Sequence, residues 1–97
     1  MLKKTEGKSE IPDNIPEVLG QSFYLQIGVY KEYNNARKVR DVLNLKGFNS
    51  RIKHVAVNDA RLYSVLEGRY PSSELAKKSS GQIKKILNYN SIIKQHN

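Results

Sequence analysis

Few side chains in this 97-residue chain are suited to acid–base or nucleophilic catalysis. The histidines are His54 and His96, and cysteine is absent, which excludes a thiol nucleophile, a thiolate metal site and a disulfide framework. His54 follows Lys53 in a segment that is expected to form a strand. We interpret His54 as an ordinary surface or partly packed residue, and we expect no catalytic residue.

The carboxylates and glycines also lack the spacing that catalysis or cofactor binding requires. Asp41 and Glu74 are expected on exposed helix faces and Asp59 in a turn, so no local pair is placed to hydrolyse a glycosidic bond. Gly28 stands alone rather than in a phosphate-binding loop, and a metal site would need ligands that the chain barely has. The sequence therefore predicts a binding protein, not an enzyme, with no metal and no cofactor.

Tyr24 and Gln26 are the side chains best suited to contact a ligand. A tyrosine ring offers a flat apolar face to a sugar or a base, and its hydroxyl group keeps that face wettable. Gln26 lies between Leu25 and Ile27 and carries both hydrogen-bond donors and an acceptor. From the residues alone, Tyr24 can equally cover the sheet and Gln26 can equally face water.

The net charge of +8 is concentrated in the later part of the chain. Residues 1–20 hold three lysines against four acidic residues, which leaves fourteen basic and five acidic residues in 21–97, a net charge of +9. Residues 1–20 are polar, with two prolines and no sustained period, and are predicted to form a flexible tail or linker. Residues 21–97 are predicted to form one basic domain whose partner is anionic. Charge alone favours nucleic acid, acidic glycan and anionic lipid about equally, and a basic surface without a dedicated ligand is the alternative.

The elements that must position Tyr24 and Gln26 begin with a strand at residues 23–30, which is rich in β-branched and aromatic residues. Leu25 and Ile27 fall on one face of this strand, and Tyr24 and Gln26 on the other.

A helix is expected next, with Asn34 as its N-cap and Gly47 at its end in the left-handed conformation. The apolar residues of this helix at helical spacing are Ala36, Val39, Val42 and Leu43.

Gly28, in the strand before this helix, indicates a β-bulge or a close approach of the backbone.

The second half begins with a strand at residues 48–57, in which Phe48 is expected to join the core. Asn58 and Asp59 predict a turn, and residues 62–67 predict a third strand.

A second helix is expected to start at residues 71–74, where serine can cap and Glu74 suits the helix dipole. Its middle contains Ser79, Ser80 and Gly81, which favour a helix poorly. The buried stripe of this second helix is predicted to be Leu75, Ala76, Ser79, Ile83, Ile86 and Leu87. A turn at 88–90 and a short strand at 91–94 complete the chain.

The predicted order is β-α-β-β-α-β, an α+β fold of the ferredoxin or RNP-like kind. Right-handed crossovers then give a four-stranded antiparallel sheet with both helices on one face. The other face stays open, and we expect Tyr24, Gln26 and Arg51 to lie on it.

Several short motifs follow one another over residues 22–95. The first half contains Tyr24-Leu25-Gln26-Ile27-Gly28, Asn35-Ala36 with Arg40 and Leu43, and Gly47-Phe48. The second half contains Leu62-Tyr63-Ser64-Val65 with Gly68, and Tyr70-Pro71-Ser72 with Ala76. In type and order, these motifs resemble those of the SPOR (sporulation-related repeat) domain family.

This resemblance implies a module that binds peptidoglycan glycan strands, with a preference for the stem-peptide-free glycan of division septa. It also implies a periplasmic or cell-envelope location within a larger membrane-anchored or lipid-anchored protein, with divisome or envelope proteins as further partners. Residues 1–4 begin like a signal peptide, but the polar residues 5–10 follow, so we expect a fragment of an exported protein or a cytoplasmic one. The short edge strands and high charge favour a monomer.

The resemblance places seven residues in the glycan-binding site. Three of them, Val29, Leu62 and Ser64, stand where the family usually has a small hydroxyl residue, an aromatic residue and an arginine, so ligand identity is open at these positions. Glu67 also replaces a usual apolar residue. The predicted glycan-binding residues are Tyr24, Gln26, Val29, Arg51, Lys53, Leu62 and Ser64.

Two other functions remain open from the sequence. An RNA-recognition module has the same order of strands and helices, and the net charge favours it. Its third strand normally carries a glycine–aromatic core, however, whereas residues 61–68 read RLYSVLEG. The second alternative is a protein-docking domain that receives a partner on its open face or on a helix.

Overall fold

The computed structural model describes residues 22–96 and has the predicted order of elements. The predicted tail at 1–20 lies outside the described residues. Neither helix of the described part has the length and apolar character needed to span a lipid bilayer. The elements are β1 (Ser22–Tyr30), α1 (Tyr33–Leu45), β2 (Ser50–Val57), β3 (Ala60–Tyr70), α2 (Ser73–Leu87) and β4 (Ile92–His96).

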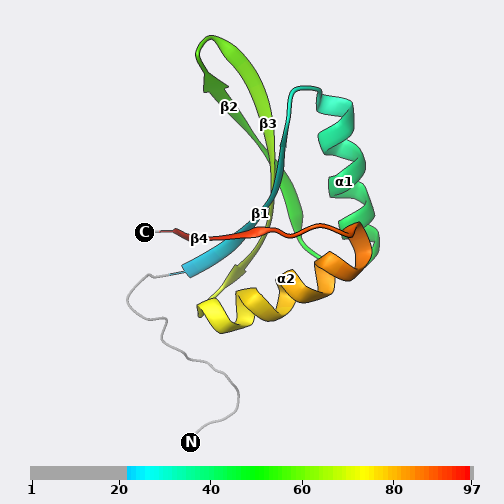
Figure 1. The fold of residues 1–97 in the computed structure, drawn as a ribbon, viewed down its shortest axis with the longest axis vertical. Coiled ribbons are helices and arrows are strands. Elements are labelled where there is room, and N and C mark those ends of the chain that lie inside the picture. The colour runs from blue at the N-terminus through cyan, green and yellow to red at the C-terminus, as the bar shows by residue number, and fades with distance from the viewer. Residues whose placement is uncertain (1–21, 97) are drawn as a thin grey trace, which may run out of the picture.

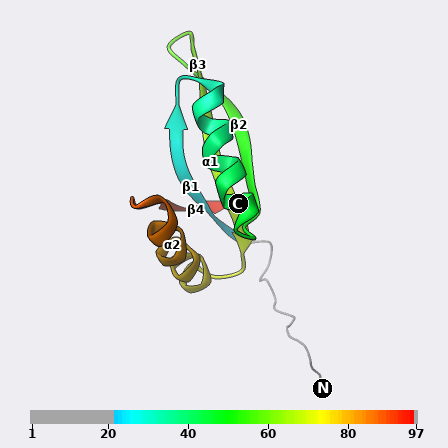
Figure 2. The same ribbon diagram turned by 90° about the vertical axis from the view of Figure 1, so that its right-hand side faces the viewer.

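The four strands form one antiparallel sheet in the order β2-β3-β1-β4. Both helices pack on the same side of it, with α1 against β1, β2 and β3, and α2 against β1, β3 and β4 (Figures 1 and 2). The predicted fold class is therefore confirmed, and the helices leave the other side of the sheet uncovered within residues 22–96.

The core lies between this sheet and the two helices. Leu25 and Ile27 of β1 point into it, with 0% and 4% of their surface exposed, as the alternation of the strand predicts. Phe48 packs against the same cluster, as expected. The remaining buried members are Ala36 and Leu43 of α1, Val65 of β3, and Ala76 and Ile83 of α2.

Strand β1 is irregular at Gly28, as predicted. Its pairing with β3 shifts register between Gln26 and Gly28, which is a β-bulge. A β-carbon at Gly28 would lie 2.7 Å from the hydroxyl oxygen of Tyr30, so the tyrosine ring occupies the space that a side chain would need. That hydroxyl lies 2.8 Å from the hydroxyl of Tyr89, and burial, followed by this hydrogen bond, raises the pKa of Tyr30.

The start of α1 differs from the prediction. The N-cap is Glu32, which makes no side-chain capping bond, and the helix includes Asn34. The prediction of Asn34 as N-cap is therefore wrong, because Tyr33 already has helical backbone. Gly47 directly follows the C-cap Lys46 and has a positive φ of 95°, so the predicted left-handed glycine at the end of this helix is confirmed.

The predicted serine cap of α2 is confirmed. The hydroxyl of Ser72 accepts a hydrogen bond from the backbone N–H of Leu75 at 3.2 Å. Leu75 itself is 47% exposed, so its predicted place in the buried stripe is wrong; it lies at the flank of the helix. The helix continues without a break through Ser80 and Gly81 to Leu87, and its C-cap Asn88 adopts the left-handed conformation.

The β2–β3 hairpin turns at Asn58 and Asp59, as predicted, and both residues have positive φ values of 51° and 67°. The hairpin extends beyond the helical layer (Figure 1). Strand β3 continues to Tyr70, beyond the predicted end at Glu67.

Glu67 is a buried carboxylate on the helix side of β3, with 2% of its surface exposed. It accepts a 2.7 Å hydrogen bond from the Tyr70 hydroxyl and a 3.3 Å bond from the backbone N–H of Asn49. Burial and then the bond to Glu67 raise the pKa of Tyr70 to about 12. These two donors explain how an acidic residue occupies a position at which apolar residues are usual in the resembled family.

Candidate functional site

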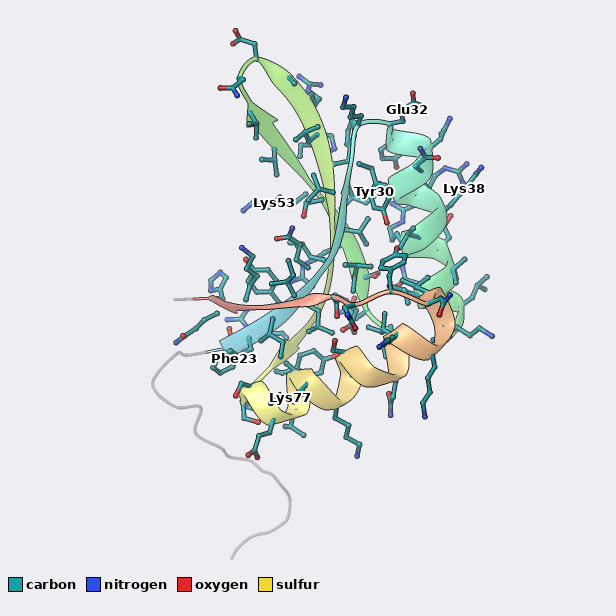
Figure 3. The ribbon with its side chains drawn as sticks, viewed as in Figure 1. Phe23, Tyr30, Glu32, Lys38, Lys53 and Lys77 are labelled. Atoms are coloured by element: carbon teal, nitrogen blue, oxygen red, sulfur yellow. The ribbon has the colours of Figure 1, made fainter. Side chains whose placement is uncertain are left out.

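The candidate site is the side of the sheet opposite the helices, which we call the open face. Residues directly opposite one another in an antiparallel pair share a face, so the register defines its members. Lys53 lies on this side in Figure 3, whereas Phe23 and Tyr30 lie toward the helices. The open face comprises Ser22, Tyr24, Gln26 and Val29 of β1, Arg51, Lys53 and Val55 of β2, Leu62, Ser64 and Leu66 of β3, and Ile92, Lys94 and His96 of β4.

All seven residues predicted for the site lie on this face. Arg51 and Gln26 flank Leu66 from the two neighbouring strands. One step toward the hairpin, Lys53 and Val29 flank Ser64, which is only 6% exposed.

Leu62 lies further along β3, opposite Val55. Tyr24 lies at the other end of the face, opposite Lys94 of β4. The seven residues thus extend along the sheet rather than gathering around one point.

One end of the open face is hollowed, with a cavity volume of about 440 Å³. Tyr24, Arg51 and Lys53 line this hollow, whereas Gln26, Val29, Leu62 and Ser64 do not. The lining residues that the sequence interpretation missed are Ser22, Asn49, Leu66, Arg69 and His96.

The missed residues have identifiable signals. Ser22 precedes Tyr24 by two residues, so the strand alternation could have placed it on the same face. Leu66 stands two residues after Ser64 and follows from the same rule. Arg69 and His96 lie beyond the predicted ends of their strands, so only the longer strands of the structure reveal them.

The ring of Tyr24 forms part of the hollow and is held between two side chains. The guanidinium carbon of Arg51 lies 6.0 Å from the ring centroid, within the range of a cation–π contact. The imidazole ring of His96 approaches in an edge-to-face geometry, with centroids 6.4 Å apart. Arg51 also donates a 3.2 Å hydrogen bond from Nη1 to the carbonyl oxygen of Gly68, which fixes its position beside the ring.

The charged side chains that line the hollow are all basic. Its lining includes Arg51, Lys53 and Arg69, all of them exposed, and no carboxylate. Three positive charges that line a hollow with one aromatic ring suit a ligand that combines a flat apolar surface with anionic groups. Within residues 22–96, no cluster of three or more metal-ligating side chains occurs.

The third strand has no aromatic side chain on the open face. Tyr63 points to the helix side, where its ring lies 5.6 Å from Tyr33 and 5.1 Å from His54. The open-face positions of β3 are instead occupied by Leu62, Ser64 and Leu66. The paired stacking rings of an RNA-recognition module are therefore missing from this strand.

Comparison with known proteins agrees with this architecture. The model of the SPOR domain family matches residues 19–95. The chain therefore belongs to the SPOR domain family, as its motifs indicated. No curated protein matches it.

Three solved structures share the fold. The peptidoglycan-binding domain of the B. subtilis cell wall lytic enzyme CwlC has a TM-score of 0.62 and 21% identity, covering 93% of this chain and 100% of the other. The SPOR domain of RlpA from Pseudomonas aeruginosa has a TM-score of 0.64 and 19% identity, covering 74% and 96%. The Spor protein DedD has a TM-score of 0.58 and 15% identity, covering 92% of this chain and 50% of the other.

Proposed function

We propose that this SPOR domain binds the glycan strands of bacterial peptidoglycan on its open face and performs no catalysis itself. Membership of the family and the peptidoglycan-binding domain of CwlC, which shares the fold, support this function. The observation that carries the choice of surface is the Tyr24 ring, flanked by Arg51 and His96 in a cationic hollow.

Tyr24 is proposed to stack on a sugar ring. Carbohydrate rings present an apolar C–H surface, and a tyrosine whose orientation is already fixed loses little conformational entropy when it receives one. Because Arg51 is anchored to Gly68 and also contacts the ring, the platform exists before the ligand arrives.

Gln26 is proposed to bind the acetamido or hydroxyl groups of a sugar next to the stacked one. It lies two residues along β1 from Tyr24, on the same face, and Leu66 separates it from Arg51. A carboxamide can both donate and accept, which matches the acetamido group. The glycan strand would thus continue from the hollow along β1 to Val29, beside Ser64, and then on toward Leu62.

The basic residues of the hollow are proposed to attract the lactyl carboxylates of muramic acid. These carboxylates are free only where the stem peptides have been removed, which accounts for a preference for stem-peptide-free glycan. Each exposed contact contributes about 0.2–1 kcal/mol. A polymer repeats the contact, so binding to a whole strand is stronger than binding to one disaccharide.

This function places the domain in the cell envelope, where it would direct a larger protein to septal peptidoglycan. In CwlC the corresponding domain belongs to a cell wall lytic enzyme. For this chain, we propose the same division of labour, in which the SPOR domain supplies the attachment and other parts of the protein supply the activity.

Co-sedimentation with purified sacculi tests the proposal. We expect the domain to sediment with sacculi, and to do so several-fold more after amidase digestion has removed the stem peptides. Equal recovery before and after digestion would reject the preference for stripped glycan. No recovery from either, with a folded domain, would reject peptidoglycan binding altogether.

A further inference from the structure

The outward side of α2 carries four lysines arranged around one glycine. Lys77 and Lys78 stand four and three residues before Gly81, and Lys84 and Lys85 stand three and four residues after it. On an α-helix these positions are the nearest neighbours of a residue on the surface. All four side chains are exposed. We call Lys77, Lys78, Lys84 and Lys85 the lysine ring.

Gly81 has no structural reason to be glycine. A β-carbon built on it meets nothing within 4 Å, and its backbone is that of an ordinary helical residue. The preceding Ser80, by contrast, contributes a 2.7 Å hydrogen bond to Ser91. Since glycine is among the poorest helix formers, its presence lowers helix stability without any gain in packing. Residues that violate a local rule without structural compensation often serve a function.

The lysine ring also concentrates like charge. On α1 two of the basic residues are paired, because Arg37 and Arg40 both contact Asp41, at 3.4 and 3.0 Å. Within residues 22–96, no carboxylate forms an ion pair with any lysine of the ring. Closely spaced positive charges repel one another, and an anion placed between them removes that repulsion.

We propose that the lysine ring binds the phosphodiester groups of an anionic wall polymer of the poly(glycerol phosphate) type. The bare backbone at Gly81 lets a compact tetrahedral oxyanion approach the helix surface, where four ammonium groups act as point charges around it. This surface lies on the side of α2 that faces away from the sheet, so it is separate from the open face. Figure 3 shows nitrogen-tipped side chains extending from α2 away from the sheet.

Two other polyanions fit this surface less well. A helix that lies on a membrane inserts an apolar side, but Ala76 and Ile83 are fully buried against the sheet, and the lysines face outward. Single-stranded nucleic acids are held by aromatic stacking as well as charge. The outward side of α2 has no aromatic residue, since the residues that surround the ring are Glu74, Gln82 and Asn88.

The test measures binding of fluorescently labelled poly(glycerol phosphate) of defined length to the full chain. Gly81→Gln keeps the charge and favours the helix, but its side chain occupies the centre of the ring. We expect this variant to bind at least fivefold more weakly while its thermal midpoint stays equal or rises. An unchanged affinity in the folded variant would overturn the role of Gly81.

A matched pair of double variants separates the ring from net charge. Lys77→Ala/Lys84→Ala should lower affinity about tenfold. Lys38→Ala in α1 combined with Lys46→Ala at its C-cap removes the same charge and should lower affinity less than twofold. An equal loss of affinity in both double variants would overturn the proposal, because binding would then depend on the net charge alone. Equally tight, ring-dependent binding of anionic phospholipid vesicles or of oligouridylate would overturn the assignment to a wall polymer. Binding to sacculi through Tyr24 is a separate measurement. The Gly81 and lysine-ring variants should bind as well as the unmodified domain to sacculi stripped of phosphodiester polymers.

Discussion

The hydroxyl group of Tyr70 donates a 2.7 Å hydrogen bond to the carboxylate of Glu67, which lies almost wholly inside the domain. Glu67→Ala would leave this hydroxyl and the backbone N–H of Asn49 without their acceptor. We expect the variant to lower the free energy of unfolding by about 2–4 kcal/mol. Urea denaturation followed by circular dichroism measures this change.

Glu67→Gln is the appropriate control, because its amide oxygen can still accept from the Tyr70 hydroxyl. It should cost clearly less than Glu67→Ala. If both variants were as stable as the unmodified domain, the buried carboxylate would contribute nothing to the fold.

Alkaline pH should destabilise the domain through Tyr70 and Tyr30. Burial and hydrogen bonding raise the pKa of Tyr70 to about 12 and raise that of Tyr30 as well. In the unfolded chain a tyrosine titrates near pH 10. The stabilisation is therefore complete below about pH 10, and it is lost as pH rises toward 12, because the unfolded state releases these protons first.

Urea midpoints between pH 8 and 12 measure this loss. The double variant Tyr30→Phe/Tyr70→Phe should be less stable at pH 8 and should show a shallower fall above pH 10. An identical slope in the double variant and the unmodified domain would contradict the role of these hydroxyl groups.

Gly68→Ala should be strongly destabilising. Gly68 has a φ of 77°, which alanine adopts at a cost, and a β-carbon there would overlap the ring of Tyr70. Left-handed backbone and displacement of the ring together predict a loss of about 2–4 kcal/mol. Gly81→Ala is the control, because its β-carbon meets nothing and should stabilise the domain by about 0.5–1 kcal/mol. Thermal melts of both variants would show opposite shifts.

Tyr24→Ala and Gln26→Ala should each weaken sacculus binding about three- to thirtyfold without lowering the thermal midpoint by more than a few degrees. Tyr24→Phe keeps the ring and should retain most of the affinity. Gln95→Ala, on the helix side of β4 opposite Phe23, controls for loss of an exposed carboxamide and should bind normally. A folded Gln26→Ala variant with full binding would remove Gln26 from the site.

The sequence was sufficient for the fold because its strongest signals are local and mutually consistent. Leu25 and Ile27 alternate with Tyr24 and Gln26, and both faces follow from that alternation alone. The turn at Asn58 could also be predicted, because asparagine tolerates the left-handed backbone that the hairpin requires.

Boundaries and burial at element ends were harder to predict. Asn34 is a good N-cap by type, but the chain enters the helix one residue after Glu32, whose side chain makes no capping hydrogen bond. Leu75 has helical spacing, yet it lies at the flank of the buried stripe.

The hollow itself depends on long-range geometry. Arg69 and His96 come from strands at different places in the sequence, and only the register of the sheet brings them to the same hollow as Tyr24. No local pattern in the sequence predicts that these three residues lie close together. Tyr24 and Gln26 of β1 could be identified from their types and alternation, whereas Arg69 and His96 could not, because they lie beyond the predicted ends of their strands.

The pairing of Ser22 with His96 brings the two ends of the described chain to one corner of the sheet. Ser22 and His96 are therefore adjacent although they lie at opposite ends of the described chain. We expect a pulling force applied at these two residues to break the hydrogen bonds between β1 and β4 one after another, so the domain should offer little mechanical resistance in this direction. It should resist more force when the load runs between one of these ends and the proposed glycan-binding open face.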